Sequence, residues 1–64
     1  MSEATATYCL KITPEQKQEL KKMFLSADWE SFGGGEYNIT LYHEEHEDKL
    51  IEWCEEREIE ATFV

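Results

Sequence analysis

The sequence has few of the residues that interrupt helices and strands, form disulfides or bind metal ions. Its 64 residues include one proline, three glycines, two cysteines and two histidines. No segment approaches the roughly 20 apolar residues of a membrane helix, and MSEATATYCL has no basic residue before an apolar run, as a signal peptide would. We therefore expect a cytoplasmic protein with no membrane partner, in which Cys9 and Cys54 stay reduced.

Basic residues are also scarce. Six lysines and arginines accompany fifteen acids, which gives a formal net charge of −9. Residues 28–64 carry twelve acids with only Lys49 and Arg57, whereas residues 1–27 carry four lysines and three glutamates. Because DNA- and RNA-binding surfaces are basic, we expect no direct binding of nucleic acid.

The apolar content is sufficient for one small folded domain. Apolar residues make up 41% of the chain, and 12% of the residues are aromatic. A chain of this length buries only about 60% of the surface that its unfolded form exposes, which leaves little material for a deep cleft. With no repeat and no linker, residues 1–64 are predicted to form a single acidic α+β domain.

The first part of the chain predicts a strand followed by a helix. Apolar residues alternate with polar ones from Ala4 to Ile12, as in a half-buried strand. Thr13, Pro14 and Gln16 then provide an N-cap, a first helical residue and a capping-box partner. Apolar residues at helical spacing continue to residue 27, so we expect the helix to end over residues 26–28.

Three consecutive glycines mark the centre of the chain. Gly33–Gly35 allow positive φ angles and predict a turn. Residues 28–32 precede it as a short strand, and residues 36–43 alternate as a full strand.

The last third combines an amphipathic helix with a closing strand. Over residues 44–57, a wheel of 3.6 residues per turn places the apolar residues on one side and most of the acids within about 120° on the other. The apolar side comprises Leu50, Ile51, Trp53 and Cys54. Residues 59–64 alternate again and are predicted to be a strand.

This order of elements is the βαββαβ pattern of the ferredoxin-like fold. We predict an α+β sandwich in which two helices cover one face of a small antiparallel sheet, with the first and third of four strands at its centre. If residues 28–32 are only a loop, a three-stranded βαβαβ sheet results.

A metal site is one interpretation of the histidines. His43, His46 and Cys54 are suitable ligand types. However, the histidines lack the four-residue spacing that would place both on one helical face, and Cys54 lies about 12 Å beyond His46 along the helix axis. We therefore expect no metal and no cofactor.

Catalysis is not expected either. Carboxylates act as an acid–base pair when their environments separate their pKa values, whereas these acids share one solvated helix face. No cluster of basic residues adjoins the cysteines to activate a thiolate, and the glycines lie between two strands, not before a phosphate-binding helix.

The acidic helix face is the main candidate for function. Like charges recur along it every four residues, and each such pair destabilises a helix slightly. We predict that this face binds a basic protein surface, with two acids near the glycine turn as a second cluster. The predicted partner-binding residues are Glu44, Glu45, Asp48, Glu52, Glu55, Glu56, Glu30 and Glu36.

Carboxylates about 5–6 Å apart along a helix also imitate a row of phosphates. A nucleic-acid-binding protein is therefore a partner class that fits. In length and charge the chain is similar to virus-encoded inhibitors of host nucleases, restriction systems and CRISPR complexes. This resemblance implies an inhibitor that acts as a nucleic-acid mimic.

Four alternatives stay open, and one of them is a metal-dependent protein, which would lose folding or binding with a chelator. Lys17, Lys21 and Lys22 of the first helix could neutralise the acids internally, which would make the face a solvated surface. A regulatory or assembly module would use the open sheet face around Tyr42 or an edge strand, including contact with a second copy in a homodimer. A domain without any site would tolerate loss of the acids.

Overall fold

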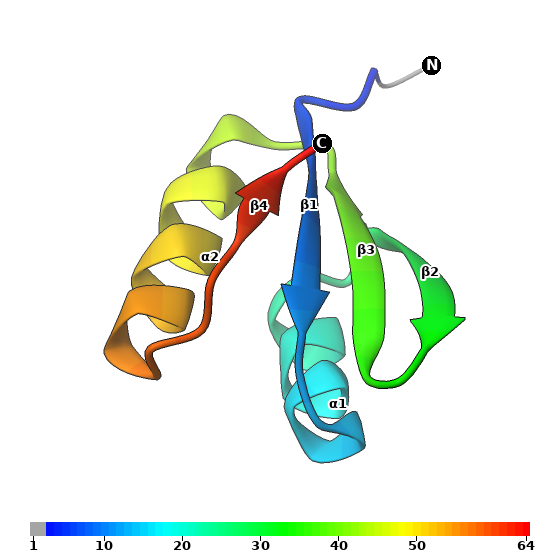
Figure 1. The fold of residues 1–64 in the computed structure, drawn as a ribbon. Coiled ribbons are helices and arrows are strands. Elements are labelled where there is room, and N and C mark those ends of the chain that lie inside the picture. The colour runs from blue at the N-terminus through cyan, green and yellow to red at the C-terminus, as the bar shows by residue number, and fades with distance from the viewer. Residues whose placement is uncertain (1–2) are drawn as a thin grey trace.

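The protein consists of a four-stranded sheet with both helices packed behind it (Figure 1). The computed structural model describes residues 3–64; Met1 and Ser2, which the predicted domain includes, lie outside the described residues. The elements are β1 (Ala6–Lys11), α1 (Pro14–Met23), β2 (Asp28–Gly33), β3 (Glu36–Leu41), α2 (Glu44–Glu56) and β4 (Thr62–Phe63). The predicted α+β class and the predicted order of elements are confirmed.

The strand order is β2-β3-β1-β4, and every neighbouring pair is antiparallel. The first and third strands are therefore central, as predicted. β2 forms one edge and pairs with β3 from Asp28 to Gly33, with a register shift between Ser31 and Gly33. Because β2 is a paired strand, the sheet has four strands and the three-stranded alternative does not form.

The helix α1 begins at the predicted cap. The Gln16 backbone N–H donates to Thr13 Oγ1 at 3.1 Å, and the Thr13 N–H donates to Gln16 Oε1 at 2.9 Å. The helix ends at Met23, earlier than predicted, and Ala27 N–H donates to the Phe24 carbonyl in a turn that leads into β2. The spacing of apolar residues alone does not distinguish this turn from one more turn of helix.

The closing strand β4 is shorter than predicted and contains only two residues. It pairs with β1 at Tyr8↔Phe63 and Cys9↔Thr62. The preceding Ile59 donates its N–H to the Cys54 carbonyl at 2.8 Å, so this part of the chain still completes the end of α2. The pairing of residues 62–63 within the monomer makes β4 the second edge of the sheet.

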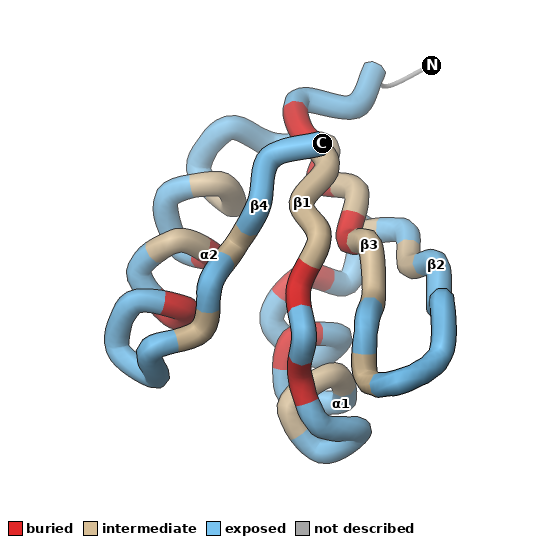
Figure 2. Tube along the Cα trace, in the orientation of Figure 1, coloured by how far each residue is buried: buried red, intermediate tan, exposed pale blue. Residues whose placement is uncertain are grey.

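The core lies between the two layers (Figure 2). Alternate side chains of β1 and β3 point toward the helices, and each helix contributes its apolar stripe. Burying one leucine, isoleucine or phenylalanine side chain stabilises the fold by about 1.5–3 kcal/mol. The buried cluster comprises Leu10, Ile12, Leu20, Phe24, Ile39, Leu41, Leu50, Trp53 and Cys54.

The glycine turn between β2 and β3 is confirmed. Gly33, Gly34 and Gly35 have φ angles of 82°, 62° and 80°, which L side chains rarely adopt. A Cβ at Gly35 would also lie 3.2 Å from the Ile12 carbonyl oxygen. Both the conformation and the close backbone approach therefore require glycine at position 35.

Candidate protein-binding surface

The outward side of α2 presents the predicted acids to solvent. Lys49 is the only lysine or arginine within this helix. Its opposite side buries Leu50, Trp53 and Cys54 in the core, so the predicted division of the helix into two sides is confirmed. The exposed acids, which we call the α2 acidic face, are Glu44, Glu45, Asp48, Glu52, Glu55 and Glu56.

The charge on α2 is unevenly matched to the helix dipole. Acids in the first turn interact favourably with the positive N-terminal end, but the last turn contains no basic residue. Glu55 and Glu56 instead place two negative charges at the negative end of the dipole. The C-terminal half of the face is therefore electrostatically unfavourable within the helix.

Glu47 has a different environment from the α2 acidic face. It is half-buried, and the Tyr8 hydroxyl of β1 donates to Glu47 Oε1 at 3.4 Å. Burial, reinforced by the negative charge of Glu47, raises the pKa of the Tyr8 hydroxyl. Glu47 thus helps to hold α2 against the sheet.

The lysines of α1 do not pair with the α2 acidic face. The Lys17 ammonium lies over the rings of Tyr37 and Trp29, 4.7 and 5.8 Å from their centroids, and so faces the sheet. Lys21 and Lys22 are exposed. Among residues 3–64, no ion pair joins a lysine of α1 to an acid of α2, so this structure does not support internal neutralisation by these lysines.

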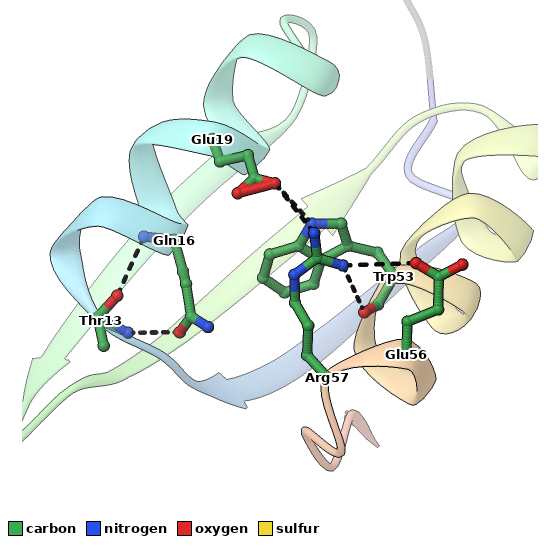
Figure 3. A network of polar contacts seen from close by, with 6 residues as sticks. All are labelled: Thr13, Gln16, Glu19, Trp53, Glu56 and Arg57. Atoms are coloured by element: carbon green, nitrogen blue, oxygen red, sulfur yellow. Dashed lines mark hydrogen bonds and ion pairs between the residues drawn. The ribbon is translucent and has the colours of Figure 1, made fainter.

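In the ion pair that does join the helices, the cation belongs to the end of α2 and the carboxylate to α1. Arg57, the C-cap of α2, places its Nη2 3.3 Å from Glu19 Oε2 of α1 (Figure 3). The same carboxylate accepts from Trp53 Nε1 at 3.1 Å. Arg57 stacks 4.3 Å from the Trp53 ring centroid and lies 3.6 Å from Glu56. Of the six acids on the α2 acidic face, only Glu56 has an ion-pair partner within the described residues.

The roles of Glu19 and Arg57 are not predicted from the sequence. A partial signal was present, because a buried indole N–H usually needs an acceptor and an arginine just after a helix suits the negative end of its dipole. The identity of the acceptor depends on how the helices dock, and Trp53 and Glu19 are 34 residues apart in the chain.

An open groove of about 360 Å³ lies between the helices beside this contact. Trp53 is buried there, and the side chain of Met23 is 43% exposed. We call this feature the interhelical groove, and it forms the flank of the α2 acidic face that adjoins α1. Its lining residues are Glu19, Met23, Lys49, Glu52, Trp53, Glu56 and Arg57.

Glu30 and Glu36 do not join the α2 acidic face. In the sheet register Glu30 lies opposite Asn38 and Glu36 opposite Lys11. Side chains alternate along β3, and Ile39 points into the core, so these acids lie on the open face of the sheet. The helices cover the other face. The structure therefore brings the six helical acids together and places Glu30 and Glu36 on the opposite side of the molecule.

The two histidines lie at the start of α2. His43 is the N-cap residue without a side-chain capping bond, and its ring is 4.8 Å from that of His46. The centroid of the His46 ring also lies 5.0 Å from that of Phe24, the C-cap residue of α1. Residues 3–64 contain no group of three or more potential metal ligands, and Cys54 is buried in the core.

The open sheet face carries mainly polar side chains. The Tyr42 hydroxyl donates to the Asp28 carboxylate, and this hydrogen bond raises the pKa of Tyr42. The hydroxyls of Thr7 and Thr40 lie 3.1 Å apart across β1 and β3. Tyr42 is thus held against β2 and does not project as a free aromatic ring.

Comparison of the chain with protein-family models, curated proteins and solved structures finds no match. In residues 3–64, neither helix has the length and apolar character needed to span a membrane. Geometry and charge are therefore the observations from which a function can be argued.

Proposed function

We propose that the protein acts in the cytoplasm, without catalysis, by binding a basic surface of another protein through the α2 acidic face. The observation that carries this proposal is the lack of internal neutralisation. Five of the six acids have no ion pair within residues 3–64, and Lys17 is directed toward the sheet. A partner's lysines and arginines would provide the missing counter-charges.

The arrangement of the acids supports this proposal energetically. Each like-charged pair at four-residue spacing destabilises the helix by about 0.2–0.5 kcal/mol. A basic partner would relieve this repulsion and gain Coulomb attraction at the same time. Because the charges are exposed, the attraction should accelerate association and weaken steeply with salt.

The partner class that fits best is a nucleic-acid-binding protein. Such a protein has a basic groove or patch that is shaped to follow phosphates, and the acids along α2 have a comparable spacing of about 5–6 Å. The protein would then be an inhibitor that occupies the nucleic-acid site of a host complex.

A capture experiment with matched charge variants tests this function. The full chain is immobilised and exposed to lysate of the source cell at low and high salt. One variant carries Asp48→Asn and Glu52→Gln, and the control carries Glu30→Gln and Glu36→Gln on the open sheet face. Both variants lose two negative charges. We expect a nucleic-acid-binding protein to be captured at low salt, lost at high salt and released by added duplex DNA.

The two variants separate the alternatives. Capture that weakens in the helix variant and persists in the control supports binding through α2. Equal capture by all three proteins, with no effect of salt, would contradict the proposal. Loss of capture in the control alone would move the binding surface to the open face of the sheet. Circular dichroism of each variant verifies that it is folded.

A further inference from the structure

Few contacts hold the C-terminal segment to the sheet. Within residues 3–64, β4 pairs with β1 at two positions, Tyr8↔Phe63 and Cys9↔Thr62, although β1 has six residues. Phe63 and Val64 are 67% and 65% exposed. A terminal segment with so little burial opens at a low cost in free energy. We therefore expect β4 to separate from β1 more easily than β3 does.

The ladder between β1 and β4 stops where the chain is bound to the end of α2. Ile59 donates its N–H to the Cys54 carbonyl at 2.8 Å, and this bond holds the residues before β4 away from β1. An open cleft of about 190 Å³ lies at this point, and both Lys11 and Glu60 line it. Two further residues of the observed register would place Lys11 opposite Glu60, as a pair of opposite charges. The monomer thus leaves part of the β1 edge without a paired strand.

The connection between α2 and β4 also contains backbone strain. Glu58 has a φ angle of 56°, a conformation that a Cβ disfavours, at the point where the chain turns back from α2 toward β1 (Figure 1). An extended Glu58 relieves this strain and directs β4 away from its own sheet. Proteins exchange identical elements between copies at short, strained connections of this kind.

We infer that two copies of the chain exchange their β4 strands, with Glu58 as the hinge. In this dimer β4 of each copy pairs with β1 of the other in the register of the monomer, so the fit of the strand to its site is already present. Ile59 and Ala61, which pack against the core of the monomer, make the same contacts in the other copy. Because the exchanged strand is no longer bound to α2, the ladder continues to Lys11 and Glu60.

Net charge determines the conditions under which the exchange occurs. Each copy has a formal net charge of −9, so two copies repel each other at low salt. Salt screens this repulsion, and the dimer therefore forms at high salt and high protein concentration. This dependence is opposite to the one expected for a basic partner on the α2 acidic face, and the inference does not depend on what that face binds.

A disulfide trap tests the exchange. One chain carries Cys9→Ser and Thr62→Cys, and the second chain is the wild type. The thiol introduced at position 62 then lies opposite Cys9 when β4 is exchanged, and opposed residues of an antiparallel ladder are close enough for a disulfide. The two chains are unfolded in urea, refolded together at high concentration and salt, and oxidised. A matched chain with Cys9→Ser and Gln18→Cys controls for random cross-linking, because Gln18 is exposed on α1.

We expect a disulfide-linked heterodimer from the chain with Thr62→Cys and little from the control. The single variant Thr62→Cys, oxidised at low protein concentration, should form the disulfide within one copy and then stay monomeric at every salt concentration. Equal cross-linking of the two mixed samples, or a wild type that sediments as a monomer at all concentrations and salts, would overturn the exchange.

Variants at the hinge add an independent check. Glu58→Gly accepts the left-handed conformation of the monomer and should lower the association constant of the dimer about tenfold, because two hinges change in each dimer. Glu58→Ala removes the same charge but keeps the Cβ, so it should dimerise at least as well as the wild type. Sedimentation equilibrium measures both constants, and circular dichroism verifies folding. Equal dimerisation of the two variants would contradict a strained hinge at Glu58.

Discussion

At the scale of single residues, a residue other than glycine has an unfavourable backbone conformation just after α2. Glu58 has a φ angle of 56°, in the left-handed region where a Cβ is disfavoured. Its N–H donates to the Glu55 carbonyl at 3.2 Å, and Ile59 N–H donates to the Cys54 carbonyl at 2.8 Å. These two bonds form a Schellman motif, in which glycine usually occupies the left-handed position.

We predict that Glu58→Gly raises the free energy of unfolding by about 0.5–1 kcal/mol. The substitution removes both the backbone strain and a negative charge near the negative end of the helix dipole. Glu58→Ala is the control, because it removes the charge but keeps the Cβ. Urea denaturation measures all three proteins, and equal stability of the two variants would show that the backbone conformation contributes nothing.

Residue roles were predictable where they depend on near neighbours. Thr13 and Gln16 form the predicted capping box because both partners lie within one turn. Glu19 and Arg57 were not predictable, because their contact joins residues 38 positions apart and requires the helices to be docked. The left-handed conformation of Glu58 was not predictable either, because the hydrogen bonds of the Schellman motif fix its φ angle and the residue type does not.

At the scale of elements, α2 contains a row of like charges without neutralising lysines from α1. Asp48 lies four residues from both Glu44 and Glu52. We predict that Asp48→Lys stabilises the fold by about 1–2 kcal/mol at low salt, because two repulsive pairs become attractive.

Salt provides the check on this prediction. Added sodium chloride should stabilise the wild type, because it screens the repulsion, and should reduce the advantage of Asp48→Lys. Asp48→Asn, which only removes the repulsion, should show about half of the gain. Thermal unfolding at low and high salt measures these differences. An advantage that does not change with salt would mean that the gain is not electrostatic.

The bounds of helices and strands were predicted best where the apolar pattern in the sequence is long. The long apolar stripe of α2 fixed its bounds to within one residue. The end of α1 and the start of β4 were wrong, because short apolar repeats also occur in the turn before Asp28 and in the segment that completes α2. Backbone hydrogen bonds end α1 early and delay the start of β4, and the residue composition does not reveal these bonds.

At the scale of the whole molecule, the acids lie on two opposed surfaces. Alternation along β3 assigns Glu36 to the face opposite Ile39. Glu30 and Glu36 were predicted as a second cluster at the glycine turn, and the structure places them on the open sheet face, apart from the helical acids. Whether either surface binds a partner stays a prediction.

Two tyrosines connect separate elements and make the fold sensitive to alkaline pH. Burial raises the pKa of Tyr8, and the hydrogen bond to Asp28 raises the pKa of Tyr42. The folded state therefore favours the neutral phenols, whereas an unfolded tyrosine ionises near pH 10. Their contribution to stability is complete below about pH 10 and is lost as pH rises through the higher pKa values of the folded state.

We predict that the free energy of unfolding falls above about pH 10. The double variant Tyr8→Phe and Tyr42→Phe should show a smaller fall, because it has no phenolate to form beside Glu47 or Asp28. Urea denaturation across this pH range tests the prediction, and tyrosinate absorbance follows the ionisation. Parallel curves for the two proteins would refute it.

The two thiols differ in accessibility and lie on different sides of the sheet. Cys54 is 1% exposed, and burial raises the pKa of its thiol. Cys9 is half-buried on the open sheet face, away from α2. A maleimide linker should therefore react at Cys9 and leave Cys54 untouched, without any engineered cysteine. Chains tethered to a sensor chip in this way would share one orientation, with the α2 acidic face directed toward the flowing solution.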